Sequence, residues 1–511
     1  LYLIDTQLIL GHLNLKQITR SDIVTTNNPR IAILGAGVSG ICMAIKLKEA
    51  GFSNLVIYEK ADRVGGTWRE NTYPGVSCDV PSHLYSFSFA QKSDWPKLYS
   101  GGSDIQAYLE DVSEKSGIIR LCQFHTEITG ATYQNYEWVV SLTDASGNNK
   151  EEKFDYIISG LGGLHSPAYP NVPGLEDFKG ASFHTAKWDH NVDLTGKNVA
   201  IIGNAASAVQ AVPEIDDKVA SLTIFQRTPN WMMDRDNKEY SGRALKLMRL
   251  LPIIPLLKRL RIFLWAEFVL HPAFRENSFM QKLARMRAEA FLRQEVKDPE
   301  LLSKLIPDYS VGCKRVLFID SYLQSLQKDH VQLVDRAVKA VTKNGITDAD
   351  DKSRNFDVII YATGFNPFNI LSSMEVKGPG GTTLSESWQE NIRSHKTVAV
   401  SGFPNFFMLL GPNSALGHNS VILMIEAQVN YIVKCLKKMR KNGWTSLDPK
   451  PASQEKFNSF IQGQLKGTVW QGSCSSWYKD SDGQNFTIWP MSATRYMLNM
   501  RKPDFSEYDV K

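Results

Sequence analysis

The sequence has little cysteine, and its cysteines are not grouped. Six occur in 511 residues, at positions 42, 78, 122, 313, 435 and 474, and none forms a C-x-x-C pair or a His/Cys cluster. This pattern is typical of single, reduced cysteines and argues against disulfides and zinc. It therefore predicts a cytoplasmic protein without a metal site.

Strong charge and long apolar runs are also missing. The net charge of +5 is small for this length and no Lys/Arg block stands out, which argues against a nucleic-acid partner. No apolar run approaches the roughly 18 residues of a transmembrane segment. The first 22 residues carry acids and cations within their apolar pattern, unlike a signal peptide. With 43% hydrophobic and 22% charged residues, we expect a globular chain of two or three domains.

One stretch, 243–270, is both apolar and basic. Pro252 and Pro255 interrupt it, and cations recur along it at Arg243, Lys246, Arg249, Lys258, Arg259 and Arg261. Such a pattern fits an interfacial membrane helix. It also fits a pair of amphipathic helices that cover a core or a substrate entrance, and this second interpretation is favoured.

The strongest motif lies at 31–59. An apolar strand meets Gly35-x-Gly37-x-x-Gly40, a helical pattern follows, and Glu59 ends the next strand, 24 residues after Gly35. The glycines provide a tight turn, close approach of a pyrophosphate and close helix packing, while an acid at this distance binds ribose hydroxyls. The segment predicts a dinucleotide site; a flavodoxin-like turn without ligand is the alternative.

A second strand–turn–helix at 199–210 lacks two of the three glycines. Its turn reads Gly203-Asn204-Ala205-Ala206-Ser207-Ala208, and Arg227 lies 24 residues after Gly203, where the first motif has Glu59. Because an arginine can bind a 2′-phosphate, this site is predicted to bind NADPH. Thr228 and Lys314 are candidates for the same phosphate. Ala205 predicts a looser pyrophosphate contact than in the first site.

A further internal similarity supports two related folds. FDYIISGLG at 154–162 and FDVIIYATG at 356–364 each read as a late core strand and its exit turn. We expect an α/β protein with two Rossmann-like dinucleotide-binding domains, the second carrying a helical insertion and opening after the first has closed. The predicted boundaries are 1–165 for the first part of the FAD domain, 166–235 for the first part of the NADP domain, 236–328 for the insertion, 329–375 for the rest of the NADP domain, and 376–511 for the rest of the FAD domain.

Two dinucleotides, one of them NADPH, indicate a redox relay with a flavin. Disulfide reductases share this arrangement but need a redox cysteine pair close in sequence, and none is present. A flavin monooxygenase fits better.

A more specific resemblance lies at 178–189, FKGASFHTAKWD, which resembles the fingerprint of the type I Baeyer–Villiger monooxygenases. Segments with the same resemblance span about residues 30 to 500 and lie at 65–89, 314–317, 362–365, 411–420 and 473–490. The resemblance implies FAD and NADPH as cofactors, O₂ as co-substrate, and conversion of a small hydrophobic ketone to an ester or lactone through a C4a-peroxyflavin. Sulfoxidation can accompany it. We expect a monomer.

The resemblance also implies site residues. The fingerprint residues would lie at the hinge between the nucleotide domains and orient NADPH; they are Phe178, Gly180, His184, Trp188 and Asp189. The other cofactor contacts implied are Gly66, Thr67, Trp68, Asp79, Tyr85, Ala362, Thr363 and Asn413. The loop at 411–420 enters a long helix for which Asn419 is a candidate N-cap. The resemblance implies that the positive end of this helix points at the flavin, and a plain C-terminal helix is the alternative. The substrate pocket is expected where the insertion meets both domains.

Arg315 is the main catalytic candidate. A Baeyer–Villiger reaction develops negative charge on a peroxide and on a tetrahedral adduct, and a fixed guanidinium stabilises both. Asp79 matches the acid that would position it. The alternatives for Arg315 are a surface or an NADPH-phosphate contact. The alternatives for the protein are an N- or S-oxygenating flavin monooxygenase and an uncoupled NADPH oxidase.

Overall fold

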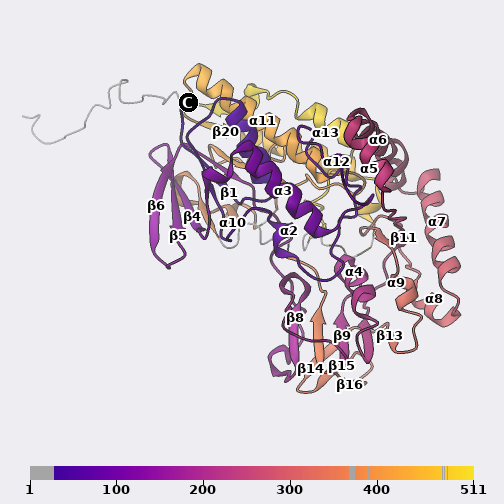
Figure 1. Ribbon diagram of the computed structural model, residues 1–511. Helices are drawn as coiled ribbons and strands as arrows, with labels where there is room; N and C mark the ends of the chain where they lie inside the picture. The colour runs from indigo at the N-terminus through magenta and orange to yellow at the C-terminus, as the bar shows by residue number, and fades with distance from the viewer. Residues whose placement is uncertain are drawn as a thin grey trace, which may run out of the picture.

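Two parallel sheets organise the chain. The computed structural model describes residues 28–366, 374–389, 391–472, 474, 476, 478–479 and 482–511. The first sheet, in the upper half of Figure 1, has five parallel strands in the order β19-β7-β1-β2-β3. Its strands are β1 (Ile31–Leu34), β2 (Leu55–Tyr58), β3 (Cys122–Gln123), β7 (Tyr156–Ser159) and β19 (Phe406–Met408).

The second sheet, in the lower half of Figure 1, repeats this pattern. Its five strands are also parallel and follow the order β13-β10-β9-β17-β8. They are β8 (Ala181–His184), β9 (Asn198–Ile202), β10 (Ser221–Phe225), β13 (Val331–Val334) and β17 (Val358–Tyr361). The predicted α/β class with two Rossmann-like folds is confirmed.

The similarity between 154–162 and 356–364 has a structural counterpart. β7 lies beside β1 and β17 lies beside β9, so each repeat adds the neighbour of its sheet's opening strand. The shared aspartate bonds at the start of that opening strand: Asp155 accepts from the backbone N–H of Arg30, directly before β1, and Asp357 from that of Asn198, the first residue of β9, both at 2.7 Å. The two Phe-Asp pairs therefore mark equivalent positions.

The C-terminal part of the chain packs on the first sheet. β19 extends that sheet, and it lies within 376–511, the part of the chain predicted to return to the first domain. The prediction that the first fold closes before the second opens is wrong for this edge strand. Helix α11 (Val421–Asn442) packs against α1 (Val38–Glu49). β18 (Glu375–Lys377) joins β4 (Glu127–Gln134), β5 (Glu137–Thr143) and β6 (Asn149–Phe154) in a four-stranded sheet. The helices α3 (Gly102–Ser116), α12 (Pro451–Leu465) and α13 (Ala493–Asn499) complete this half.

A helical segment separates β10 from β13 in sequence. It runs from β11 (Met232–Asp234) to β12 (Leu317–Ile319) through α5 (Gly242–Leu250), α6 (Ile253–Trp265), the π-helix η4 (Ala266–Leu270), η5 (His271–Phe274), α7 (Phe279–Glu295) and α8 (Pro299–Leu305). The predicted helical character is confirmed. The prediction for 243–270 is a helix pair that covers a core or a substrate entrance. The prediction of a core is wrong for most of its apolar side chains, because only Met248, Pro255 and Arg259 of α5 and α6 are buried, and the substrate entrance stays a prediction.

The remaining elements are short. They are α2 (Thr67–Glu70), α4 (Ala206–Ile215), α9 (Tyr322–Ser325), α10 (Leu384–Ser387), β14 (Val338–Thr342), β15 (Gly345–Asp348), β16 (Ser353–Asn355), β20 (Leu447–Pro449) and β21 (Tyr508–Val510), with further single 3₁₀ turns. No helix among the described residues is long and apolar enough to cross a membrane. The predicted absence of a signal peptide concerns residues that lie outside the described ones.

Candidate active site

The first glycine turn joins β1 to α1. Gly35 has a φ of +86°, and a Cβ on Gly40 would meet the carbonyl oxygen of Gly35 at 1.9 Å, so the turn itself requires both glycines. A Cβ on Gly37 would meet only the backbone of Gly66, its Cα at 3.5 Å and its N at 4.0 Å, which are ordinary contacts. The protein therefore does not require a glycine at position 37. A pyrophosphate that approaches the N-terminus of α1 would require a glycine at this position. The turn therefore fits FAD.

Glu59 follows β2 and is buried. Its carboxylate accepts hydrogen bonds from the backbone N–H groups of Ala36 at 2.9 Å and Ala61 at 3.0 Å, and pairs with Arg69 at 3.0 Å. The Glu59 carboxylate thus holds the backbone of the glycine turn in place. The ribose contact predicted for Glu59 would be a second role. The buried partner Arg69 was not foreseen, although it lies within the 65–89 segment of the resemblance.

The loop that carries Gly66 and Thr67 lies against the glycine turn. Gly66 has a φ of +56°, and a Cβ there would lie 3.0 Å from the Cα of Gly37, so close approach of the two backbones favours glycine. After this turn, Trp68 donates from Nε1 to the hydroxyl of Tyr85 at 3.2 Å, with their rings edge to face. The predicted flavin-side residues 66, 67, 68 and 85 are therefore brought together.

Arg315 and Asp79 form a bidentate pair although 236 positions separate them. The guanidinium donates from Nε at 2.6 Å and from Nη2 at 2.8 Å to the two carboxylate oxygens. Burial opposes ionisation of Asp79, but the charge of Arg315 outweighs it and the pKa of Asp79 is lowered. In return the carboxylate raises the pKa of Arg315. Within the described chain, Nη1 of Arg315 has no hydrogen-bond partner.

The second turn keeps only the glycine that its backbone needs. Gly203 has a φ of +114°, and a Cβ there would meet the carbonyl oxygen of Ala362 at 2.3 Å. The side chain of Asn204 is buried and donates to Gln226 at 2.7 Å and to the carbonyl of Thr228 at 3.0 Å. Asn204 thus holds the turn with its side chain, and only its backbone remains for a cofactor. Ala205 is exposed and extended, directly before α4.

Arg227 and Lys314 come from different elements and lie near each other. Arg227 follows β10 and is exposed, with no ion pair to any described residue. Burial and the charge of Arg227 lower the pKa of Lys314, which also lies over the ring of Tyr309 at 5.0 Å. Each of two neighbouring cations disfavours the charged form of the other, and an anionic group bound between them offsets this repulsion. They agree with the predicted 2′-phosphate contact.

The fingerprint segment 178–189 forms strand β8 and a 3₁₀ turn, so His184 and Trp188 are not helical neighbours. A Cβ on Gly180 would meet the carbonyl oxygen of Asp357 at 2.3 Å and the ring of Phe178 at 2.7 Å. Trp188 contacts Phe183 edge to face. The segment is therefore held by tight packing against β17.

His184 ends strand β8 and is fully buried. Its Nδ1 accepts from the backbone N–H of Ala186 at 3.0 Å, which places the proton on Nε2. Burial lowers the pKa of His184 to about 4, so the ring is neutral at pH 7. Asp189 accepts from the N–H of Asn191 at 3.0 Å and caps a turn. Both arrangements favour a structural or positioning role.

Three further predicted residues lie at loop turns. Thr363 donates to the carbonyl of Ala168, and the backbone N–H of Ala362 donates to Ile202. Asn413 is buried, and its side-chain amide donates to the carbonyls of Asn485 and Ile488 at 3.0 and 3.1 Å. The amide of Asn413 is therefore occupied within the protein. The cap of α11 is Ser420, not Asn419, because its hydroxyl accepts from the N–H of Ile422 at 3.2 Å.

Two side chains that sequence reasoning missed link the halves of the molecule. Gln210 of α4 accepts from the Tyr73 hydroxyl at 2.8 Å and donates to the carbonyl of Ser77 at 3.1 Å. Arg235 donates to the Ser77 hydroxyl at 2.6 Å and pairs with Asp320. No motif marks these residues. They hold the segment before Asp79 against the second nucleotide fold.

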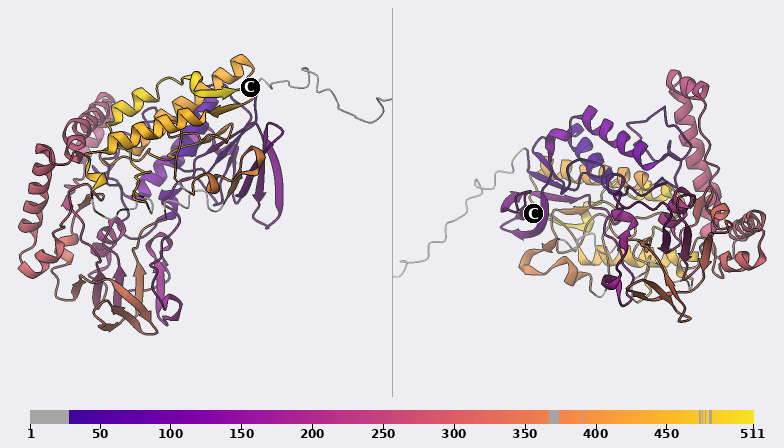
Figure 2. Two further views of the ribbon diagram at one scale, coloured as in Figure 1. Left: turned by 180° about the vertical axis from the view of Figure 1, so that it is seen from behind. Right: turned by 60° about the horizontal axis from the view of Figure 1, so that its bottom comes forward.

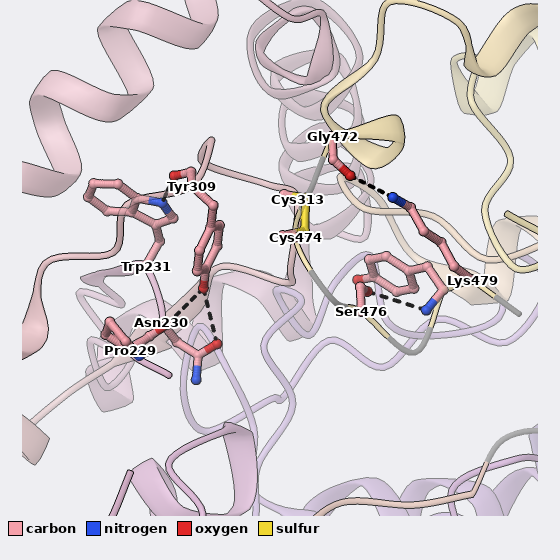
Figure 3. Close-up of a disulfide and its surroundings, with 10 residues drawn as sticks. Pro229, Asn230, Trp231, Tyr309, Cys313, Gly472, Cys474, Ser476 and Lys479 are labelled. Atoms are coloured by element: carbon pink, nitrogen blue, oxygen red, sulfur yellow. Dashed lines mark hydrogen bonds between the residues drawn. A yellow bond between two sulfur atoms is a disulfide. The ribbon is translucent and has the colours of Figure 1, made fainter. Parts of the chain in front are cut away.

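The expectation of reduced cysteines is wrong for one pair. Cys313 and Cys474 form a disulfide across 161 residues, with their Cα atoms 6.4 Å apart (Figure 3). Tertiary packing, which sequence spacing does not show, places the segment before Arg315 beside the C-terminal segment. Cys42, Cys78, Cys122 and Cys435 are free thiols. In the described ranges, no group of His, Cys, Asp and Glu residues could hold a metal ion.

The segment before Arg315 has a second attachment. Trp231 donates from Nε1 to the carbonyl of Tyr309 at 2.8 Å, and the Tyr309 hydroxyl donates to the carbonyl of Pro229 at 2.9 Å (Figure 3). It is thus tied on one side to residues that follow Arg227 and on the other to Cys474. A surface hollow of about 520 Å³ that includes Gly180 and Asp193 lies at the amino ends of β8 and β17, away from this site.

Comparison with known proteins decides the family. A family model described as flavin-binding monooxygenase-like matches residues 28–377. A Baeyer-Villiger monooxygenase of Streptomyces coelicolor is 39% identical over 488 residues, which cover 94% of this chain and 92% of that protein. One from Pseudomonas aeruginosa is also 39% identical, over 94% and 91%. The chain belongs to the Baeyer–Villiger monooxygenases. The predicted resemblance is confirmed.

Solved structures agree with this assignment. OTEMO, crystallised with FAD and NADP, is 25% identical, with a TM-score of 0.83 over 95% of this chain and 100% of that one. Cyclohexanone monooxygenase from Rhodococcus sp. Phi1, bound to NADP⁺, is 25% identical, with a TM-score of 0.83 over 94% and 99%. This Baeyer–Villiger monooxygenase is therefore an FAD-dependent enzyme that uses NADPH, as predicted.

Proposed function

We propose that this monooxygenase inserts an oxygen atom beside the carbonyl of a small hydrophobic ketone, giving an ester or a lactone. The observation that carries the proposal is the Arg315–Asp79 pair, because it holds a permanent cation with one nitrogen, Nη1, left for a ligand. The names of the structural relatives, which include cyclohexanone and steroid monooxygenases, support a ketone as substrate.

Arg315 stabilises the negative charge that develops as the carbonyl is attacked. Its guanidinium stays protonated throughout, since the Asp79 charge raises its pKa, and the bidentate contact fixes its plane. Asp79 acts as the positioning residue. A flavin held at the first glycine turn and reduced by NADPH would supply the activated oxygen from O₂. Arg315 supplies the fixed electrostatic environment for that chemistry.

The nucleotides are held by the two turns. Residues 35, 37, 40, 59 and 66–68 would bind FAD, and Arg227 with Lys314 would bind the 2′-phosphate of NADPH. The free backbone N–H groups at the start of α4 would face its pyrophosphate, because no side chain caps that helix. The ring of His184, which burial keeps neutral at pH 7, positions this cofactor.

Location and assembly are part of the same proposal. We propose a monomer in the cytoplasm, with the four free cysteines as support for a reducing compartment. The Cys313–Cys474 disulfide argues against that compartment. Mass measurement of the protein isolated from its natural source, with and without thiol alkylation, will show which state the pair has there.

Product analysis tests the function. The purified holoenzyme is supplied with NADPH, O₂ and a panel of linear, cyclic and aryl ketones, with a thioether in parallel, and products are identified by mass. Esters or lactones support the proposal. Sulfoxide alone, with no ester from any ketone, indicates an N- or S-oxygenating enzyme. Hydrogen peroxide as the sole product of NADPH oxidation indicates an uncoupled oxidase.

A further inference from the structure

Helices α5 and α6 and the start of η4 expose an unusual number of apolar side chains. Ten of the seventeen large apolar residues that are exposed in the described chain lie between 247 and 268. Leu250, Ile253, Leu256, Leu257, Leu260 and Phe268 are the ones on which the argument relies, at 48–73% exposure. We call this surface, residues 242–268, the apolar–basic face. It lies at one edge of the molecule (Figures 1 and 2).

The same face is positively charged. Arg243, Lys246 and Arg261 are exposed and have no ion pair with any described residue. Between 241 and 270 the only acid is Glu267, which is buried and bound to the N–H groups of Ala493 and Thr494. The solvent side of the face therefore offers cations and apolar groups without a compensating carboxylate of its own.

The helices are too short to span a bilayer. α6 has 13 residues, which corresponds to about 20 Å at a rise of about 1.5 Å per residue, against a hydrocarbon thickness of about 30 Å. A short helix with an apolar surface and surrounding cations lies in the plane of a lipid headgroup layer. Trp265, 45% exposed, is the residue type enriched at that depth.

We propose that the apolar–basic face docks this enzyme on the surface of an anionic lipid bilayer. A second copy of the chain fits less well. A symmetric dimer through this face would place Arg243, Lys246 and Arg261 opposite or near their own copies, and like charges across an interface oppose association. Anionic headgroups instead neutralise the cations while the acyl region receives the leucines.

The inner side of α6 is attached to the loop that follows Asp79, independently of the outer, apolar–basic face. The buried guanidinium of Arg259 donates to the carbonyls of His83, Leu84 and Ser86 at 2.9–3.2 Å. These residues follow Asp79 in the same loop. Substitutions on the outer side leave the attachment intact, so lipid binding and catalysis can be tested separately.

Vesicle flotation with the FAD-loaded full chain tests the proposal. One set of vesicles is phosphatidylcholine alone, and in the other about one lipid in three is phosphatidylserine. The wild type is expected to float with the anionic vesicles, and less as salt is raised. L256E/L260E alters two exposed leucines one turn apart on α6 and is expected to bind at least about tenfold more weakly. K246Q/R261Q is expected to lose the preference for anionic vesicles.

Tyr136→Glu is the matched control. Tyr136 is 58% exposed at the turn between β4 and β5, which lie far from α5 and α6 in Figure 1, and the change adds one negative charge at an exposed aromatic side chain, where L256E/L260E adds two. It is expected to bind vesicles like the wild type. NADPH oxidation by all variants without vesicles reports that they are folded and loaded.

Three results overturn the proposal. The first is no flotation of the wild type with either vesicle. The second is equal binding of wild type and L256E/L260E. The third is a wild-type dimer in light scattering that L256E/L260E converts to a monomer without any vesicle binding, which would assign the face to a second copy. Failure of the ketone assay affects none of these measurements.

Discussion

Arg315 keeps its charge while two of its three nitrogens are held by Asp79. For Arg315→Ala we expect a fall of about 10²- to 10³-fold in ester formation, because a cation aimed at developing negative charge is lost. Flavin reduction by NADPH should largely persist, since that step precedes the attack on the ketone. Rapid-mixing spectra measure reduction, and product analysis measures ester.

Arg336→Ala is a suitable control for this prediction. Arg336 also donates from Nε to an aspartate, Asp350, at 2.8 Å, but both are exposed on the second fold. It should leave both steps unchanged. Normal ester formation by Arg315→Ala would reject the catalytic role.

Arg227 is the residue on which cofactor choice depends. For Arg227→Ala we expect the KM for NADPH to rise by about ten- to a hundredfold, as a charge-assisted contact of about 1.5–3 kcal/mol is lost. The KM for NADH should change little, because NADH has no 2′-phosphate. Steady-state kinetics with both cofactors measures the difference, and an equal rise for both would remove Arg227 from this site.

Sequence reasoning found residues in motifs and missed residues that act through tertiary contacts. Glu59 and Arg227 could be located because a fixed spacing from a glycine turn places them at the end of a neighbouring strand. Arg69 and Gln210 could not, since their partners depend on how loops fold back. Asn204 is a third case. It lies in the predicted turn, but its side chain bonds to Gln226 and Thr228 and so holds the turn itself.

At the scale of elements, the two nucleotide turns differ in the backbone contacts that require a glycine. Gly40 is required because a Cβ would meet a carbonyl oxygen at 1.9 Å, whereas Ala208 occupies the third position of the second turn, fully buried. The strand–turn–helix pattern was predictable from sequence because its spacing follows from these contacts. The exact cap of α11 was not, since Asn419 and Ser420 are both good N-caps.

Ala205→Gly is expected to tighten NADP⁺ binding. Ala205 has φ −90°, so its backbone does not need glycine, and its methyl lies exposed before α4, where a pyrophosphate would approach. Removing the methyl should lower the Kd for NADP⁺ without loss of stability, since glycine is a better N-cap than alanine. Calorimetric titration measures the Kd. An unchanged Kd would contradict the looser contact proposed for this turn.

The disulfide joins two elements that would otherwise meet only by packing. Because it closes a loop of 161 residues, we expect C313S/C474S to lower the free energy of unfolding by about 3–5 kcal/mol. A thiol reductant should lower the stability of the wild type but not of the variant. Denaturant unfolding with and without reductant measures both effects. Cys122→Ser, at a half-buried free thiol, is the control and should keep the response to reductant.

For the whole molecule, composition and motifs predicted the two parallel sheets, since each is a repeat of the same strand order. They predicted that the chain from 376 returns to the first domain, but not which contacts join the two sheets. β19 enters the first sheet after the second is complete, and contacts across more than 130 positions, such as Gln210 with Ser77, hold the halves together. Nor does an apolar helical pattern distinguish helices that bury most of their apolar side chains from helices that expose them, as α5 and α6 do.

Buried histidines should make the whole molecule sensitive to acid. Burial lowers the pKa of His83 and of His184 to about 4 from an ordinary value of 6.5. Between these values the unfolded chain binds more protons than the folded one. Stability should therefore fall as pH decreases from about 6.5 to about 4, by up to about 1.4 kcal/mol per pH unit for each such histidine.

His83→Phe tests this prediction without touching the cofactor sites. Both ring nitrogens of His83 lack a hydrogen-bond partner, so phenylalanine keeps the ring and removes only the titration. Urea unfolding at about pH 7 and about pH 5 should show a smaller acid loss than in the wild type, by up to about 2 kcal/mol. His125→Gln, at an exposed histidine, should keep the wild-type loss. The same acid loss in His83→Phe as in the wild type would mean that His83 does not titrate with unfolding.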